Sequence, residues 1–211
     1  MDIQKRKYVG AYFGVKRALD LILSAFLLLI LALPMLIIGI WVASTSSGGA
    51  IFRQERIGRG ERSIVCLKFR TMYRDAPNDV PSSEFKNAEA YVTSVGRFLR
   101  RTSLDELPQL INVLRGEMSL VGPRPLIPRE SGIRELRRAA GVYELRPGMT
   151  GLAQINGGER LCDREKAELD RKYRESVSFF TDLRIVALTP ARAFRRDRNE
   201  RDGELRERKK I

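Results

Sequence analysis

The chain contains no histidine among its 211 residues and only two cysteines. Without imidazole, any catalysis has to depend on carboxylates, Lys, Arg, Tyr, Ser or Cys. Cys66 and Cys162 are isolated from each other, which gives neither a zinc-site spacing nor a disulfide framework. The pattern favours reduced thiols in a cytoplasm-facing protein, with Cys66 packed in an apolar strand.

Acidic residues are also scarce relative to basic ones. The sequence has 26 Asp and Glu against 39 Lys and Arg, for a formal net charge of +13. Such an excess favours polyanionic partners, whether anionic lipid, nucleic acid, or nucleotide and phosphate substrates. The length is sufficient for one domain with its own hydrophobic core.

One long apolar run is present, from Leu21 to Ala43, with Ser24 as its only clearly polar side chain. As a helix with a rise of about 1.5 Å per residue, it is long enough for a bilayer core of about 30 Å. A signal peptide is disfavoured because the run is too long and no good cleavage site follows it. A buried core helix is disfavoured because the run is so long and unbroken.

Two features favour a re-entrant anchor over a membrane span. Pro34 lies in the middle of the run, where it removes one backbone hydrogen bond and kinks a helix. Both flanks are basic, and positive charge marks the cytoplasmic side. The basic residues are Lys5, Arg6, Lys7, Lys16 and Arg17 before the run, and Arg53, Arg56, Arg59 and Arg62 after it. We therefore expect a kinked helix that enters one leaflet and returns, with Trp41 at the interface.

The remaining sequence predicts an α+β fold that is mostly α. Ile51–Ile57 and Ser63–Phe69 are expected to form a β-hairpin, and helices are expected near 91–100, 106–115 and 164–174. The pattern at 179–194 suits an amphipathic helix, either on the membrane surface or packed on the domain. The expected organisation is a membrane segment at 1–46, a catalytic domain at 47–194 and a charged, disordered tail at 195–211.

Asp105 and Glu106 stand side by side just before the expected helix at 106–115. A paired carboxylate can supply a nucleophile and a ligand for a divalent metal. A purely structural interpretation is equally open at this stage, because Ser103 to Glu106 matches the capping-box pattern and acids complement a helix N-terminus.

Several cations in the sequence are suited to binding phosphate near this acidic pair. Lys68 and Arg70 end an expected strand, and Arg100 lies just upstream of the pair. Arg124 stands between two prolines, and Arg146 precedes another, so that their backbones are restricted. Rigid arginines suit bidentate binding of phosphate oxygens, although a solvated or salt-bridged surface arginine is the plain alternative for each.

The order of four motifs resembles that of the bacterial sugar transferases, the monotopic polyprenyl-phosphate hexose-1-phosphate transferases, in their minimal catalytic form. The motifs are KFRTM at 68–72, SLDELPQL at 103–110, MSLVGPRP at 118–125 and RPGMTGLAQ at 146–154. The resemblance implies transfer of a sugar-1-phosphate from a UDP-sugar to undecaprenyl phosphate with release of UMP. It also implies an enzyme at the bacterial inner membrane, with its active site facing the cytoplasm.

The same resemblance assigns roles to individual residues. Asp105 takes the place of the nucleophile that forms a covalent phosphosugar intermediate, and Glu106 matches a glutamate associated with Mg²⁺. Lys68, Arg100, Arg124 and Asp170 fall where family members have active-site residues. By analogy, the short form favours an N-acetylated amino sugar, and a homodimer is compatible with the sequence.

The sequence departs from the family pattern at two places. Family members commonly carry an Arg directly after an Asn-Gly that corresponds to Asn156 and Gly157, whereas Gly158 and Glu159 precede Arg160 here. Arg160 is the next arginine, and the resemblance implies that it contacts the substrate in that region. Leu33, and not the usual serine, precedes Pro34.

Two other functions compete with sugar-phosphate transfer. A basic, membrane-anchored module that binds polyanions without catalysis is the first, although the sequence lacks the interleaved aromatic and basic residues of a nucleic-acid binder. A membrane phosphatase with an acidic nucleophile is the second.

Overall fold

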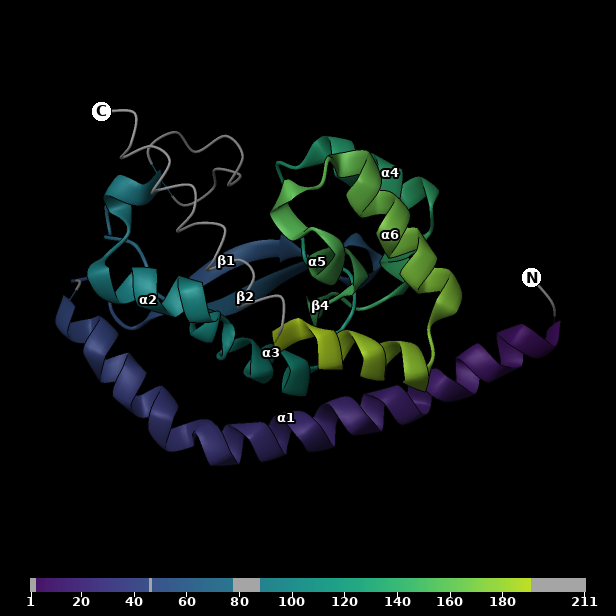
Figure 1. The fold of residues 1–211 in the computed structure, drawn as a ribbon, viewed down its shortest axis with the longest axis horizontal. Coiled ribbons are helices and arrows are strands. Elements are labelled where there is room, and N and C mark those ends of the chain that lie inside the picture. Colours follow the sequence, from purple (N-terminus) through teal and green to yellow (C-terminus); the bar gives the residue numbers. More distant parts are fainter. Residues whose placement is uncertain (1–2, 46, 78–87, 191–211) are drawn as a thin grey trace.

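The computed structural model describes residues 3–45, 47–77 and 88–190, and within the first helix it describes side chains from Tyr12 onward. The fold is α+β and mostly α, as the sequence predicts (Figure 1). In chain order the elements are α1 (Ile3–Thr45), β1 (Ile51–Ile57), β2 (Ser63–Phe69), α2 (Ser94–Thr102), α3 (Gln109–Arg115), β3 (Ser119–Val121), α4 (Ser131–Ala139), β4 (Gly148–Thr150), α5 (Leu152–Asn156) and α6 (Asp163–Ser176). A further helix occupies residues 179–190.

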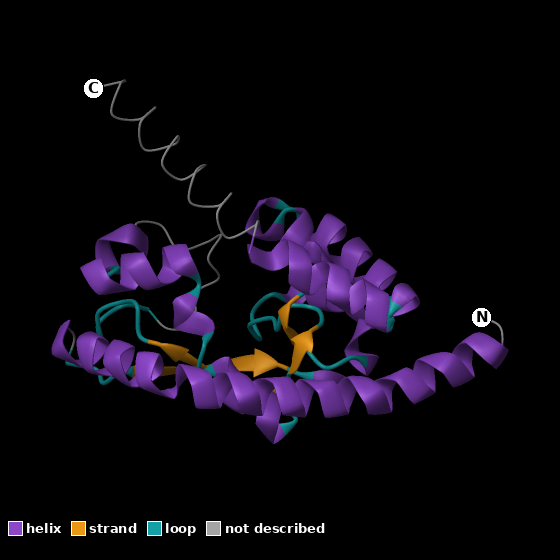
Figure 2. Ribbon diagram, turned by 60° about the horizontal axis from the view of Figure 1, so that its bottom comes forward, coloured by secondary structure: helices purple, strands orange, loops and turns teal. Residues whose placement is uncertain are grey.

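Helix α1 is continuous through Pro34 and follows one whole side of the molecule. Figure 1 shows it curving along the lower edge and turning upward in its C-terminal part, and in Figure 2 it crosses the full width in front of the strands. Its stretch Tyr12–Thr45 is long and apolar enough to cross a membrane, with a mean hydropathy of 3.0 in its most apolar window. Only 6% of that window is buried, which is unlike the core helix of a soluble protein.

Both halves of α1 pack against the rest of the chain. In the C-terminal half, Ile38 and Val42 share a hydrophobic cluster with Phe69 of β2 and with Val95 and Leu99 of α2. This packing ties the apolar helix to the hairpin and to α2.

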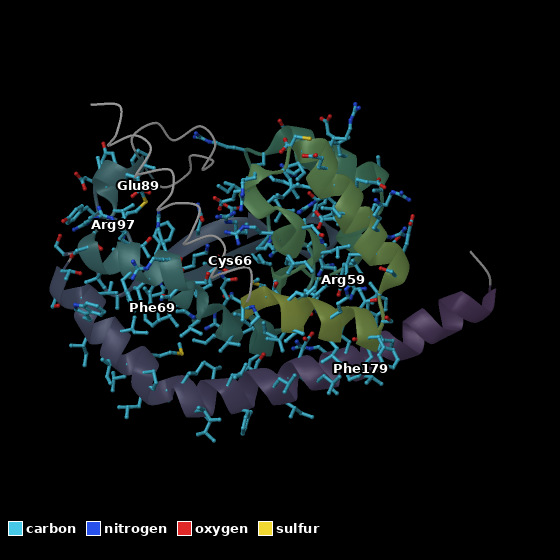
Figure 3. The ribbon with its side chains drawn as sticks, viewed as in Figure 1. Arg59, Cys66, Phe69, Glu89, Arg97 and Phe179 are labelled. Carbon is cyan, nitrogen blue, oxygen red and sulfur yellow. The ribbon has the colours of Figure 1, made fainter. Side chains whose placement is uncertain are left out.

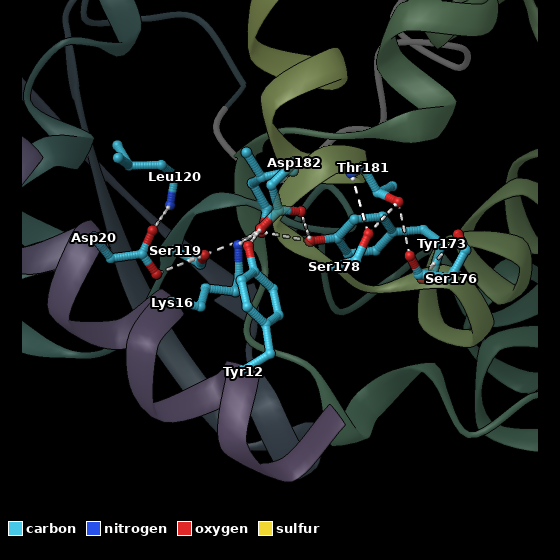
Figure 4. Close-up of polar contacts among 11 residues, drawn as sticks. Tyr12, Lys16, Asp20, Ser119, Leu120, Tyr173, Ser176, Ser178, Thr181 and Asp182 are labelled. Atoms are coloured by element: carbon cyan, nitrogen blue, oxygen red, sulfur yellow. Dashed lines mark hydrogen bonds and ion pairs between the residues drawn. The ribbon is translucent and has the colours of Figure 1, made fainter. Parts of the chain in front are cut away.

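In the N-terminal half of α1, the contacts are polar. Tyr12 and Lys16 contact Asp182, and Asp20 accepts hydrogen bonds from the Ser119 hydroxyl at 2.8 Å and from the Leu120 backbone N–H at 3.1 Å (Figure 4). The helix therefore contributes to the core of the domain at both ends of its long apolar run.

The predicted hairpin is confirmed with the same residue bounds. β1 and β2 are antiparallel, with Ile51 opposite Phe69 and Ile57 opposite Ser63. The turn between them uses Gly60 at a positive φ of 65°, which glycine adopts without strain. The hairpin delivers Lys68 at the end of β2.

A second pair of strands was not expected from the sequence. β3 and β4 are parallel, with Ser119 opposite Gly148 and Val121 opposite Thr150. The backbones approach so closely that a Cβ on Gly148 would lie 2.1 Å from the Gly122 nitrogen. Each strand has only three residues, too few for a pattern of alternating burial to show in the sequence.

The helix expected at 106–115 begins later than predicted, and the capping box is not formed. Leu104–Glu106 is a separate 3-10 turn, and α3 starts at Gln109 after Pro108. Ser103 has a left-handed backbone, with a φ of 57°, and makes no side-chain cap. Asp105 and Glu106 thus lie in a tight turn, and helix capping does not account for them.

The other predicted helices are present. α6 confirms the helix at 164–174, and α2 begins three residues later than the predicted start at 91, where Thr93 accepts a hydrogen bond from the Gly96 N–H. The helix at 179–190 packs on the domain, which is one of the two interpretations of its pattern, and its place on a membrane surface stays a prediction. Its inner residues Asp182 and Ile185 are buried, whereas its outer apolar side chains are exposed. Residues 191–211, which include the predicted tail, and residues 78–87 lie outside the described residues.

Candidate active site

Glu106 accepts hydrogen bonds from two cations through a single carboxylate oxygen. Lys68 Nζ lies 3.0 Å and Arg124 Nη1 lies 3.1 Å from Glu106 Oε1. The three residues come from the end of β2, the turn before α3 and the loop after β3. Burial opposes ionisation of Glu106, but the charges of Lys68 and Arg124 outweigh it and hold the pKa of this carboxyl well below its usual range.

The pKa of Asp105 is shifted in the opposite direction to that of Glu106. Its carboxylate accepts no hydrogen bond from the part of the chain that the structure describes. Burial raises the pKa of Asp105, and the negative charge of Glu106 raises it further, against the opposing charges of Lys68, Arg100 and Arg124. A partly desolvated carboxylate without hydrogen bonds keeps its lone pairs available for attack on an electrophile.

Two further arginines contribute to this site, and only one was predicted. Arg100 donates from Nε to the Thr71 hydroxyl at 2.9 Å, which holds its charge near Asp105. Arg56, which the sequence indicated only as a flanking positive charge, lines a small hollow between the hairpin and the turn. The residues lining this hollow are Arg56, Cys66, Lys68, Glu106, Gln109, Arg124 and Pro125. Figure 3 labels Cys66 near the middle of the molecule.

The hollow has an excess of positive charge. Burial, together with the charge of Arg124, lowers the pKa of Arg56 to about 10. Lys68 and Arg124 each use one hydrogen bond on Glu106, although an ammonium offers three N–H donors and a guanidinium five. Such a site has spare donors and positive charge for an anion with several oxygens, such as a diphosphate.

Asp170 does not contact the carboxylate pair directly. It is almost fully buried in α6 and forms an ion pair with Arg137 of α4, with 2.6 Å between Arg137 Nη2 and Asp170 Oδ2. Arg137 in turn donates from Nη1 to the backbone carbonyl of Arg124 at 2.8 Å. The predicted site residue Asp170 thus reaches the site through an arginine that the sequence did not single out.

Two of the other three arginines predicted to bind substrate donate to backbone carbonyls. Arg70 donates to the carbonyls of Gly49 and Gly48 at 3.0 and 2.7 Å, and Arg146 donates to the Gly116 carbonyl at 2.9 Å. Arg160 ends an exposed 3-10 turn. None of them makes a hydrogen bond or ion pair with Asp105 or Glu106 among the described residues. In the same turn as Arg160, the negative charge of Glu159 does reach Arg124.

Comparison with known proteins identifies the family. Residues 11–196 match the family described as "Bacterial sugar transferase". The chain belongs to this family. The match includes α1 from residue 11, the hairpin, the carboxylate pair and the helix at 179–190, so the family covers all parts of the site described above.

Three relatives of this sugar transferase are informative. The chain is 40% identical to the UDP-glucose:undecaprenyl-phosphate glucose-1-phosphate transferase of Escherichia coli K12, and the match covers 85% of this chain and 40% of that protein. It is 41% identical to the undecaprenyl-phosphate glucose phosphotransferase of Komagataeibacter xylinus, over 82% of this chain and 35% of that protein. The exopolysaccharide production protein ExoY of Rhizobium meliloti is 40% identical and is covered over 83% of its length.

The sugar transferase therefore spans less than half the length of the first two of these relatives, whereas it spans most of ExoY.

The site has few metal ligands of its own. Among the described residues, no group of three or more His, Cys, Asp or Glu side chains is placed to hold a metal ion.

Proposed function

We propose that this protein is a phosphoglycosyl transferase that moves a sugar-1-phosphate from a UDP-sugar to undecaprenyl phosphate, through a covalent intermediate on Asp105. The observation that carries the proposal is the contrast within the carboxylate pair. Glu106 is fixed by two cations, and Asp105 beside it accepts no hydrogen bond from the described residues. Relatives named for this transfer make it the first activity to test.

In the first step, an Asp105 carboxylate oxygen attacks the phosphorus that carries the sugar. The new O–P bond forms as the bond from that phosphorus to the bridging oxygen breaks, and UMP leaves with the bridging oxygen. Asp105 then carries the sugar-1-phosphate as an acyl phosphate. No proton has to move in this exchange, which suits a site without histidine.

In the second step, a phosphate oxygen of undecaprenyl phosphate attacks the same phosphorus. The bond between Asp105 and phosphorus breaks and the carboxylate is restored. The product is a sugar joined to the lipid through a diphosphate. Two displacements, with Asp105 as the nucleophile of the first and the leaving group of the second, replace a direct transfer between two polyanions, which repel each other.

The cations bind and orient the diphosphate during both steps. Among the residues that the structure describes, the side chains of Lys68 and Arg124 donate only to Glu106, so both keep N–H groups for a phosphate next to Asp105, and Arg100 adds a third positive charge. Their charge offsets the negative charge that builds up on the transferring oxygens, which is where most of the catalysis of phosphoryl transfer arises.

The donor set fits Mg²⁺ together with the substrate. Mg²⁺ uses one or two carboxylates plus substrate phosphates and waters. Glu106 Oε2 accepts no hydrogen bond from the described residues, and Asp105 is adjacent. These two residues would hold the ion, which would supply additional neutralisation of phosphate charge. Because four cations surround the pair, we expect the ion to bind with the diphosphate and only weakly without it.

We also propose that the protein is monotopic, with both ends of α1 on the cytoplasmic side. What supports this is that the polar contacts at residues 12–20 and the apolar contacts at residues 35–42 join the same domain. A helix that crossed a bilayer could not keep both. The exposed apolar residues of α1 lie between and around these contacts: Ile22, Leu23, Phe26, Leu29, Ile30, Leu33, Leu36, Ile37 and Ile40.

A screen of UDP-sugars with undecaprenyl phosphate and Mg²⁺, read as released UMP, tests the activity. The names of the relatives favour UDP-glucose as the first candidate, whereas the short chain by analogy favours an N-acetylated amino sugar. Release of UMP that depends on the lipid acceptor supports transfer. Without the lipid, the proposed intermediate accounts for at most one UMP per protein molecule, so continued release of UMP without the lipid would indicate hydrolysis by a phosphatase.

The alternative of a polyanion-binding module makes a different prediction. Binding by charge alone falls steeply with salt concentration, and it does not involve Asp105. Unchanged lipid and nucleotide binding in Asp105→Asn, together with no turnover in the wild type, would favour that alternative.

A further inference from the structure

The loop that carries Arg124 has few backbone N–H donors with which to form hydrogen bonds. Pro123 and Pro125 flank Arg124, and neither proline has an N–H to donate. A loop of this kind has to be held through its carbonyl oxygens or through its side chains.

Four consecutive carbonyls of this loop each accept one hydrogen bond. The Gly148 N–H donates to Pro123 and the Ile57 N–H donates to Leu126, both at 2.8 Å. The two carbonyls between them accept from side chains. Arg137 Nη1 lies 2.8 Å from the Arg124 oxygen, and Arg56 Nη1 lies 3.1 Å from the Pro125 oxygen.

Each of these two arginines is itself fixed by an acceptor that uses its other nitrogens. Arg137 donates through Nε and Nη2 to Asp170 Oδ2 at 2.8 and 2.6 Å, and Arg56 donates through Nε and Nη2 to Gln54 Oε1 at 3.1 and 2.5 Å. In each arginine, the edge formed by Nε and Nη2 donates to the acceptor, and the remaining nitrogen, Nη1, donates to a carbonyl of the loop. The planar guanidinium suits this double task, and an ammonium does not.

We propose that Arg56 and Arg137, here called the arginine clamp, are positioning residues that hold Arg124 against the transferring diphosphate. This inference rests on the proposed function for its substrate, but the geometry requires only that Arg124 bind a diphosphate. Asp170 of α6 holds Arg137 of α4 in place by accepting its Nε and Nη2 hydrogen bonds. The clamp holds the backbone carbonyls of Arg124 and Pro125. The side chain of Arg124 can still turn partly from Glu106 toward the substrate.

The test is a double-mutant cycle between Arg137→Lys and Arg124→Ala. The lysine can still pair with Asp170, but it cannot at the same time donate to the Arg124 carbonyl. We expect Arg137→Lys to weaken binding of inorganic pyrophosphate, measured by calorimetry, by about tenfold. In the Arg124→Ala background the same change should cost less than about twofold, since the clamp acts through Arg124.

Two further variants separate positioning from general stability. Arg138→Lys, one residue along α4, is the matched control, because Arg138 is exposed and pairs with Glu61 away from the loop. Arg56→Lys should reproduce the effect of Arg137→Lys from the side of the hairpin. Thermal unfolding of each variant identifies any that are misfolded, and Asp170→Asn, which keeps the shape of this side chain, replaces Arg137→Lys if that variant does not fold.

The outcomes for the clamp and for the proposed function can be told apart. Equal losses of pyrophosphate affinity with and without Arg124 would overturn the clamp, and so would a wild-type protein that does not bind pyrophosphate. Coupled losses would support the clamp even if no UDP-sugar gave UMP, a result that would count against the proposed function alone. UMP release with additive losses would keep the function and reject the clamp.

Discussion

Asp182 accepts a hydrogen bond from the hydroxyl of Tyr12 at 2.7 Å, across 170 positions of sequence. The same carboxylate accepts from Lys16 and, through its other oxygen, from the buried Tyr173 hydroxyl at 2.7 Å. Figure 4 shows how these residues converge from α1, α6 and the helix at 179–190. The apolar helix is therefore fixed to the domain by a buried polar network as well as by apolar packing.

The first prediction concerns this network. Tyr12→Phe removes one donor to Asp182 and should lower the free energy of unfolding by about 1 kcal/mol, the usual value for such a hydrogen bond. Thermal unfolding in lipid nanodiscs measures it. Tyr73→Phe is the control, because Tyr73 is exposed. Equal stability of Tyr12→Phe and wild type would show that the network does not hold α1.

The second prediction concerns the pH dependence of stability at Glu106. Its pKa is held below the value in the unfolded chain, so that it stabilises the fold above about pH 4.3 and loses this contribution as the pH falls through the folded pKa. Glu106→Gln should therefore lose less stability than wild type between pH 6 and pH 3. Denaturant unfolding at several pH values provides the comparison, and parallel curves would contradict the ion pairs with Lys68 and Arg124.

The third prediction concerns Asp105, where the shift has the opposite sign. A raised pKa means that the ionised carboxylate costs stability in the folded state at neutral pH. Asp105→Asn should therefore abolish turnover and at the same time raise the unfolding free energy by about 1 kcal/mol, as expected of a residue kept for function at the expense of stability. A variant that is inactive because it is less stable would not support a nucleophile.

The fourth prediction separates Arg70 from the substrate-binding arginines. Arg70 holds the carbonyls of Gly48 and Gly49 and lies 5.7 Å from the centre of the Phe52 ring. Arg70→Met should lower the melting temperature and leave KM for the UDP-sugar unchanged. Arg53→Met, at an exposed position of the same hairpin, is the control. A large rise in KM for Arg70→Met alone would support the prediction made from the sequence that Arg70 binds phosphate.

The fifth prediction concerns the membrane. Leu29 and Leu33 are 78% and 66% exposed on α1, and they would contact lipid. Leu29→Asp with Leu33→Asp should reduce the fraction of protein that floats with vesicles, because charge in the hydrocarbon region is costly. Cysteines introduced at residues 3 and 45 should both react with a membrane-impermeant reagent from the cytoplasmic side only. Labelling of residue 3 from the periplasm would reject the monotopic arrangement.

The parts of the fold that could be predicted from the sequence are those with local signals. The β-hairpin has two strands of seven residues around a glycine turn, and α6 has a long run of helix-forming residues. The carboxylate pair was also visible, because Asp105 and Glu106 lie next to each other in a recognisable motif. Lys68, Arg100 and Arg124 come together as expected around this pair.

The parts that could not be predicted depend on contacts between distant segments. Nothing local distinguishes Arg137 from its neighbour Arg138, yet one is buried against Asp170 and the other is exposed on Glu61. The pairing of β3 with β4 requires the close approach of Gly122 and Gly148, which no periodicity reveals. The capping box at Ser103, the structural alternative that the sequence left open, does not form, and the sequence does not show the left-handed backbone at this residue.

The most direct test of the account is intact-mass spectrometry of the protein after mixing with UDP-sugars in the absence of lipid acceptor. The account predicts a mass increase equal to one sugar phosphate, located on Asp105 by peptide analysis and removed when undecaprenyl phosphate is added. Turnover of a UDP-sugar with the lipid, without any adduct on Asp105 under rapid quenching, would contradict it.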